Sequence, residues 1–212
     1  MADFESMANA VVAGDFNRAA DLTKQAIDEG AEPIEIINQG LIKGMNVVGA
    51  RFKAGDMYVP EVMMAARSMK AGMDLVKPLI AEKDMPTSGK VVLGTVAGDL
   101  HDIGKNLVGM MMESAGMTVV NLGVDITPEK FAQAVREHKP EVVALSALLT
   151  TTMLAMKDTI EVLQEEGLRS SVKVIVGGAP VTSDFATEIG ADGWAPDAAS
   201  AKDLALELAG KN

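Results

Sequence analysis

The sequence predicts an α/β protein in two parts, a four-helix bundle followed by a doubly wound parallel sheet of five strands. Residues 4–82 repeat apolar side chains at helical spacing, whereas from residue 90 onward short runs of branched residues alternate with amphipathic stretches. Between the two patterns, residues 83–89 contain Pro, Ser and Gly and continue neither. We therefore predict a helical domain over residues 1–88 and a sheet domain over residues 89–212.

Glycine and proline divide the first part into four predicted helices. The breaks fall at Gly14-Asp15, from Gly30 to Pro33, and from Gly55 to Pro60. The third and fourth helices each carry one apolar stripe, which would let the segment close as a small antiparallel bundle. The stripes comprise Ile34, Ile37, Leu41, Met45, Val48 and Phe52 in the third helix, and Met63, Ala66, Met69, Met73, Val76 and Ile80 in the fourth.

The second part contains five predicted strands, each followed by a helical stretch. The strands are expected at residues 91–96, 118–122, 142–145, 173–176 and around Gly193-Trp194. Consecutive βα units of this kind favour the flavodoxin-like strand order 2-1-3-4-5, whose switch point lies between the first and third strands. Ligands of such sheets bind outside the carboxyl ends of the strands, so the loops after strands one, three and four should converge on one site.

Composition narrows the classes of function. The formal charge is −11, and no stretch gathers Lys and Arg into a basic face, so nucleic acid is not an expected partner. The amino terminus is acidic, and no apolar run approaches the ~20 residues that cross a bilayer, so we expect a cytoplasmic protein without a membrane partner. The sequence has no cysteine, which leaves histidine and carboxylates as its strong metal ligands.

One of only two histidines, His101, lies where the first strand ends and a helix begins. Asp99 can accept a hydrogen bond from one imidazole nitrogen and so fix the tautomer that presents the other nitrogen to a metal. Gly98 and Gly104 remove side chains that would keep a large flat ligand off the backbone. His138, by contrast, lies in a polar helix exit, where a histidine is more often a surface residue.

Two further loops at the same predicted edge carry small or polar residues. Residues 146–152, after the third strand, end in three threonines, and Gly177-Gly178 follows the fourth strand. Each loop has an ordinary structural explanation, because threonines commonly cap the following helix, here expected over residues 153–166, and a Gly-Gly pair commonly forms a turn. Their combination at one sheet edge favours a ligand site.

Together these loops resemble the cobalamin-binding signature of corrinoid proteins and of the B12-binding region of methionine synthase. The matching residues are Asp99-x-His101-x-x-Gly104, Ser146-x-Leu148, Gly177-Gly178 and the segment 190–198, and in the helical part Met45-Asn46-Val47-Val48-Gly49, Phe52, Pro60 and Ala65-Ala66. The resemblance is greatest to the small corrinoid proteins of methyltransferase systems that demethylate methanol, methylamines, betaines or aromatic methyl ethers.

The resemblance implies a helical cap over residues 1–88 and a Rossmann-like cobalamin-binding domain over residues 89–212, with a cobalamin or related corrinoid bound base-off and His-on. His101 would be the lower axial ligand of cobalt, Asp99 would hydrogen-bond the far ring nitrogen, and Thr152 would continue this relay where methionine synthase has a serine. The corrin ring would lie against Gly98, Asp102, Ile103 and Gly104. The nucleotide tail would lie beside Ser146, Leu148, Thr150, Gly177 and Gly178.

The implied function is that of a non-autonomous methyl-carrying subunit of one-carbon metabolism. It would accept a methyl group on Co(I) from a substrate:corrinoid methyltransferase and pass it from methyl-Co(III) to a second methyltransferase that serves tetrahydrofolate or coenzyme M. A reductive activating protein is implied as a further partner.

Three alternatives stay open at this point. A cobalamin-sensing regulator also joins a helical segment to a B12 domain, but the acidic amino terminus offers no basic DNA-binding module. The small subunit of an adenosylcobalamin mutase would lack the helical half. A receiver-type signalling domain would need an acidic cluster after strand one and an aspartate after strand three, where Ser146 stands.

Overall fold

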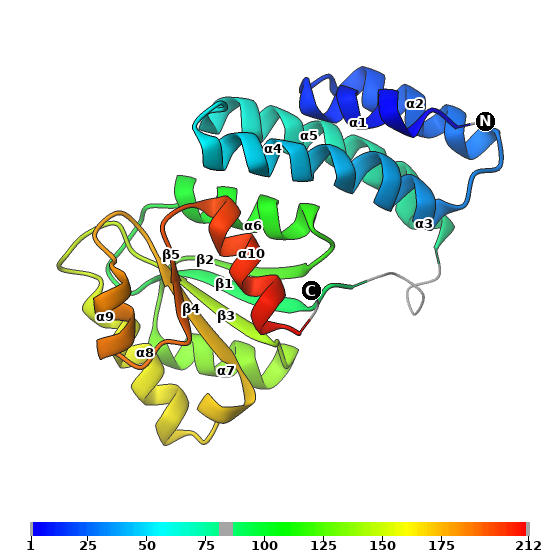
Figure 1. The fold of residues 1–212 in the computed structure, drawn as a ribbon. Coiled ribbons are helices and arrows are strands. Elements are labelled where there is room, and N and C mark those ends of the chain that lie inside the picture. Colours follow the sequence, from blue (N-terminus) through cyan, green and yellow to red (C-terminus); the bar gives the residue numbers. More distant parts are fainter. Residues whose placement is uncertain (1, 81–86, 211–212) are drawn as a thin grey trace. The chain divides into compact units, whose positions relative to one another are not determined.

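The protein folds into helices and strands that follow one another in the predicted order, as seen in a computed structural model that describes residues 2–80 and 87–210 (Figure 1). The chain divides into two compact units, one made of helices and one built on a sheet. Residues 83–86 of the predicted linker lie outside the described residues, and the boundary at residues 88 and 89 stays a prediction. No helix within the described ranges is long and apolar enough to cross a membrane.

Residues 2–80 of the helical unit form four helical segments, as predicted. They are α1 (Phe4–Val12), α2 (Phe16–Asp28), a continuous segment made of α3 (Pro33–Glu35), η1 (Ile36–Ile42) and α4 (Lys43–Ala54), and α5 (Val59–Val76), which ends in the 3-10 turn η2 (Lys77–Leu79). Within the third segment, η1 is a π-helix, which helical periodicity does not distinguish from an α-helix. Most of the stripe predicted for the third helix is buried, including Leu41, Met45 and Val48. In the fourth helix Met69 and Val76 are buried, whereas Met63 is exposed.

The second unit is a five-stranded parallel sheet in the order β2-β1-β3-β4-β5, which confirms the predicted topology. Its strands are β1 (Lys90–Val96), β2 (Thr118–Ile126), β3 (Val142–Ser146), β4 (Lys173–Gly177) and β5 (Gly193–Ala195). The helices are α6 (Ile103–Ser114), α7 (Pro128–His138), α8 (Leu154–Glu165), α9 (Ser183–Glu188) and α10 (Ala198–Leu208), with a 3-10 turn η4 (Arg169–Ser171) before β4.

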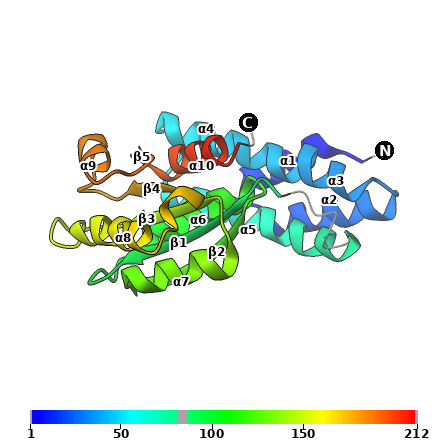
Figure 2. The ribbon, with the colours of Figure 1, turned by 90° about the horizontal axis from the view of Figure 1, so that it is seen from below.

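Helices cover both faces of this sheet (Figure 2). Successive strand residues pack on opposite faces. Val92, Val143 and Val174 pack with α7, α8 and α9 on one face. Their neighbours Val91 and Val142 pack with α6 and α10 on the other. Burial on both faces explains why the strands read as continuous apolar runs in the sequence.

Strand β2 departs from regular pairing near its carboxyl end. It is in register with β1 from Thr118 to Asn121, and it then twice takes an extra residue, so that Gly123 pairs with Gly94 and Ile126 pairs with Val96. Between these two pairs the backbone of Asp125 has a positive φ of 54°. The two bulges thus deliver Asp125 to the edge where the loop after β1 begins.

Candidate functional site

Hydrogen bonds join the loops that follow β1 and β3 and the end of β4, which confirms that these segments meet at the carboxyl edge of the sheet. The Leu148 N–H donates to Oδ2 of Asp99 at 2.8 Å, which links the loops after β3 and β1. The Ala147 N–H donates to the Gly177 carbonyl at 3.2 Å, which links the loop after β3 to the last residue of β4. The predicted residues of these segments therefore lie at one edge of the sheet.

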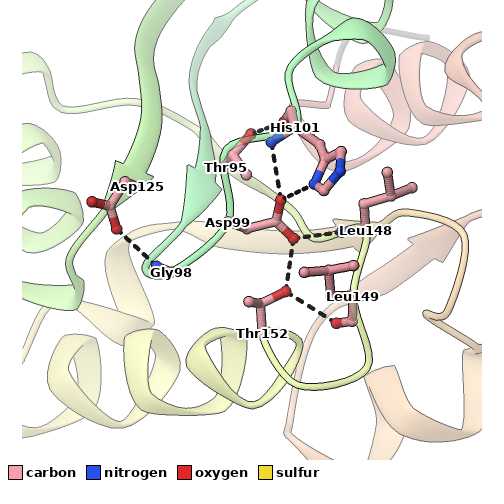
Figure 3. Close-up of polar contacts among 8 residues, drawn as sticks. All are labelled: Thr95, Gly98, Asp99, His101, Asp125, Leu148, Leu149 and Thr152. Carbon is pink, nitrogen blue, oxygen red and sulfur yellow. Dashed lines mark hydrogen bonds and ion pairs between the residues drawn. The ribbon is translucent and has the colours of Figure 1, made fainter.

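Asp99 is the centre of this hydrogen-bonded group (Figure 3). Its side chain is fully buried, and each carboxylate oxygen accepts two hydrogen bonds. Oδ1 accepts from the backbone N–H of His101 at 3.0 Å and from Nδ1 of the same residue at 2.7 Å. Oδ2 accepts from the Leu148 N–H at 2.8 Å and from the Thr152 hydroxyl at 2.7 Å.

The four donors keep the Asp99 carboxylate ionised. Burial acts to raise the pKa of Asp99, but the hydrogen bonds from Leu148, Thr152 and His101 outweigh burial and hold its pKa well below the usual range. A protonated acid would place its own hydrogen against one of these donors. The His101 Nδ1 must accordingly carry a proton that it donates to Asp99, so in the neutral ring the lone pair is on Nε2.

His101 presents that second nitrogen outward. Its side chain is half exposed, with 50% of its surface accessible, although its Nδ1 is bound to a fully buried partner. Thr95, which is buried, donates from its hydroxyl to the His101 carbonyl at 2.8 Å and so anchors the backbone of His101. Within residues 2–80 and 87–210, no three His, Asp or Glu side chains gather closely enough to hold a metal ion.

Thr152 does not act as the helix cap that its position suggests. Helix α8 begins at Leu154, its N-cap residue is Met153, and no side chain caps it. The Thr152 hydroxyl instead lies 2.7 Å from Asp99 Oδ2 and 3.0 Å from the Leu149 carbonyl, and it can donate to either oxygen. The hydroxyl thus contacts the Asp99 carboxylate, while its part in a relay to a metal stays a prediction.

The site glycines fall into two groups when a Cβ is placed on each. At Gly178, which has a φ of 128°, a Cβ would lie 1.8 Å from the Ala147 carbonyl oxygen, so the fold itself requires glycine. At Gly177 a Cβ would lie 3.2 Å from the carbonyl oxygen of Ala195, which is a tight contact. At Gly104 a Cβ would meet nothing within 4 Å. The bare backbone at Gly104 leaves open space that a ligand can use.

Large apolar side chains are exposed around this open space. Leu100 and Ile103 are each 71% exposed and Leu148 is 43% exposed. Exposed apolar side chains beside a few fixed polar groups are typical of a cofactor-binding surface. The donor set, the bare Gly104 and this apolar surface all fit a large, flat, metal-containing group held by His101.

The remaining predicted residues lie in the same loops. Asp102 is exposed, and its Oδ2 accepts from the Asn106 side chain at 3.0 Å at the start of α6. Ser146 is half-buried at the end of β3, in register with Thr95 and Gly177. Thr150 is exposed in the loop after β3. Contact of these residues with a cofactor stays a prediction.

Sequence reasoning missed three contributors to the site. Thr95 anchors His101, and Asp125 accepts a hydrogen bond from the Gly98 N–H at 2.8 Å. Lys105 is buried and donates to the side-chain oxygens of Asn106 at 2.6 Å and Asn121 at 2.8 Å. Burial lowers the pKa of Lys105 below its ordinary value, and the nearby Asp102 carboxylate offsets only part of this effect. A lone lysine or threonine in an amphipathic pattern carries no signal for such a role.

Fold and site together define an α/β protein that holds a cofactor at the carboxyl edge of its sheet. Comparison with known families is specific: the chain belongs to the B12-binding family, because the model of the B12 binding domain matches residues 89–202 and a second B12 binding domain model matches residues 3–77. The cofactor of this family is cobalamin or a related corrinoid, which confirms the resemblance and the cofactor predicted from the sequence.

Several corrinoid proteins are similar along most of their length. A corrinoid protein of Desulfitobacterium hafniense is 45% identical over 100% of this chain and 99% of its own. Dimethylamine corrinoid protein 1 of Methanosarcina acetivorans is 46% identical over 84% of each chain. Among solved structures, a chain of the methanol:cobalamin methyltransferase complex from Methanosarcina barkeri has a TM-score of 0.87 at 33% identity, covering 98% of this chain and 79% of that chain.

Proposed function

We propose that this protein is the methyl carrier of a corrinoid-dependent methyltransferase system, with His101 as the lower axial ligand of cobalt. The observation that carries the proposal is the buried Asp99 carboxylate, which holds the proton of the imidazole on Nδ1 and leaves the Nε2 lone pair for the metal. The corrinoid supplies a cobalt centre that takes up a methyl group and gives it away. The relatives named as methylamine corrinoid proteins and the methanol:cobalamin methyltransferase complex support this role.

The chain's own residues would hold the group and manage one proton. Asp99 makes the His101 imidazole a stronger donor toward metal, and Thr152 and the Leu148 N–H keep the carboxylate in place. A His101 imidazole not bound to metal could hold a proton on Nε2 while its Nδ1 stays hydrogen-bonded to Asp99. Ligation and protonation at Nε2 are therefore coupled.

The surface around His101 would receive the rest of the cofactor. The corrin ring would lie over Gly104 and beside Gly98, Asp102 and Ile103, where the backbone is bare or the side chain is exposed. The displaced nucleotide tail would run toward the loops after β3 and β4. Its neighbours there would be Ser146, Leu148, Thr150, Gly177 and Gly178.

The partners that we propose for this carrier are enzymes. A substrate:corrinoid methyltransferase would load the methyl group, and a second methyltransferase serving tetrahydrofolate or coenzyme M would remove it. A reductive activating protein would restore the carrier. The solved methanol:cobalamin methyltransferase complex supports a methyltransferase as partner. The alternative of a cobalamin-sensing regulator is not favoured by the relatives, whose names are those of methylamine corrinoid proteins.

Reconstitution with hydroxocobalamin tests this proposal directly. The wild type, His101→Ala and the control His138→Ala are loaded, their absorption spectra are recorded, and methyl loading is followed with methylamine or methanol and the corresponding methyltransferase. We expect the wild type and His138→Ala to show a histidine-ligated spectrum and to accept methyl groups. His101→Ala should retain the corrinoid yet lose that spectrum. A His101→Ala protein with the wild-type spectrum would contradict the assignment.

A further inference from the structure

We propose that Asp125 is a positioning residue, which holds the loop between Gly98 and His101 in the geometry that cobalt ligation needs. This inference rests on the proposed function, since it concerns the same imidazole. Asp125 lies in β2, whereas the loop that it holds follows β1. Asp125 does not touch His101 itself. Its influence on the metal would therefore pass through the backbone of the loop.

Asp125 makes two hydrogen bonds that bracket Asp99. Its Oδ1 accepts from the Gly98 N–H at 2.8 Å, and its own N–H donates to the Asp99 carbonyl at 3.0 Å. Figure 3 shows the side-chain bond, on the side of the loop away from Leu148 and Thr152. One residue thus fixes two peptide groups of the loop, the one between Ala97 and Gly98 and the one between Asp99 and Leu100.

The sheet is distorted to bring Asp125 to this place. Two bulges in β2 lie between Asn121 and Ile126, and Asp125 adopts a left-handed backbone with a φ of 54°. Non-glycine residues rarely adopt this conformation, although aspartate tolerates it better than most. Within the described residues only Lys139, at the end of α7, shares it. Bulges next to active sites commonly re-aim a side chain, which is what these do.

The loop needs this support because its first residue is glycine. Gly98 has a φ of 79°, and a Cβ there would meet only Thr152 Cγ2, at 3.6 Å, so neighbouring atoms confine it little. Besides the hydrogen bonds at the Asp99 carboxylate, the backbone of the loop is held by the bond from the Asp99 N–H to the Val96 carbonyl at 3.2 Å and by the bond from the Thr95 hydroxyl to the His101 carbonyl at 2.8 Å. Without the Asp125 carboxylate, Gly98 loses its acceptor and Asp99 can shift relative to the imidazole it orients.

Glu141 offers a matched control, because it binds the backbone at the other end of β1. Its Oε2 accepts from the Lys90 N–H at 2.7 Å, and its N–H donates to the Lys90 carbonyl at 3.0 Å. Like Asp125, it is exposed and ties the end of β1 to a neighbouring strand. A loss that merely reflects a weakened end of β1 would therefore occur in Glu141→Ala as well.

The experiment compares Asp125→Ala, Asp125→Gly, Asp125→Asn and Glu141→Ala with the wild type. Amide hydrogen exchange at Gly98 is measured by NMR without corrinoid, and the histidine-ligated fraction is measured after loading with hydroxocobalamin. Asp125→Gly keeps a left-handed backbone accessible while it removes the carboxylate, and Asp125→Asn keeps an acceptor oxygen. We expect the Ala and Gly variants to exchange about tenfold faster at Gly98 and to lose about tenfold in the His-on equilibrium, with Asn close to wild type.

Each result decides the proposal. Faster exchange at Gly98 with a lower histidine-ligated fraction in the Ala and Gly variants, restored in Asn and absent in Glu141→Ala, supports it. A wild-type histidine-ligated fraction in both the Ala and Gly variants overturns it and leaves the proposed function standing. An equal loss in Glu141→Ala also overturns it. If the wild type itself binds corrinoid without histidine ligation, the proposed function fails, and the role of Asp125 fails with it.

Discussion

Replacing Asp99 with asparagine removes one charge and keeps the shape of the side chain. The amide oxygen can accept at only one of the two positions, so the amide NH2 must face either the two donors of His101 or the pair formed by the Leu148 N–H and the Thr152 hydroxyl. The second orientation costs less, because Thr152 can turn its proton to the Leu149 carbonyl, 3.0 Å away, and accept from the amide. The Leu148 N–H is then left without an acceptor.

The size of the effect follows from that count of hydrogen bonds. One backbone N–H loses its acceptor, which costs about 1–3 kcal/mol, and the bonds to His101 lose the assistance of the charge. We expect Asp99→Asn to lower the free energy of unfolding by about 3 kcal/mol at neutral pH. For a chain of 212 residues, this corresponds to a melting temperature lower by roughly 10 °C.

The pH dependence of this difference carries a definite sign. Because the hydrogen bonds lower the pKa of Asp99 in the folded protein, its contribution to stability is fully present above the unfolded pKa of about 4 and is lost as the pH falls further toward the folded pKa. Asparagine does not titrate. The stability difference between wild type and Asp99→Asn should therefore shrink as the pH is lowered below about 4.

Urea denaturation of both proteins at neutral pH, and at a series of pH values down to the lowest at which both still fold, measures this difference. Asp184→Asn, which changes an exposed carboxylate in α9, serves as the control and should match the wild type closely. The reasoning is refuted if Asp99→Asn is as stable as the wild type at neutral pH. It is also refuted if the difference does not change with pH, since the buried carboxylate would then not be ionised.

Substitutions at three further positions test the relay and the glycines. Thr152→Val should cost about 1 kcal/mol and weaken histidine ligation, whereas Thr152→Ser should preserve both, as measured by urea denaturation and by the spectrum of the loaded protein. Gly104→Ala should leave the stability unchanged or raise it by up to about 1 kcal/mol, because the site lies in helix α6, yet a titration should show weaker corrinoid binding. Unchanged affinity would show that the open space above Gly104 is not where the ring lies. Gly178→Ala should lower stability by more than about 2 kcal/mol even without cofactor, because its Cβ would collide with Ala147; a stable variant would contradict this.

Most of the fold could be predicted because the strands are buried on both faces. Such strands stand out as runs of branched residues, and four of the five end within a residue or two of the expected positions. Strand β2 is the exception, since it continues to Ile126 through residues such as Gly123 and Asp125 that are typical of turns. The π-helix η1 was not predicted either, because its apolar residues also suit an ordinary helix.

The site was only partly predictable, because some of its contacts join residues that are far apart in the sequence. His101 and Asp99 are two residues apart, so the spacing alone suggests their hydrogen bond. Thr152 is 53 residues from Asp99, and its bond to the carboxylate could be expected only from the family resemblance. The role of Asp125 depends on two bulges that shift the register of β2, and periodicity does not reveal bulges.

The most direct test of the central claim is to label the histidines with ¹⁵N and identify the axial nitrogen of cobalt. The labelled protein is loaded with cobalamin, reduced to Co(II) and examined by electron paramagnetic resonance, in which an axial ¹⁴N splits each line into three and an axial ¹⁵N into two. The chain has only two histidines, and His138→Ala leaves His101 as the sole label. We predict doublets in that labelled variant and triplets in its unlabelled counterpart. Triplets from the labelled protein would show that the cofactor's own base still binds the metal, and they would contradict the account.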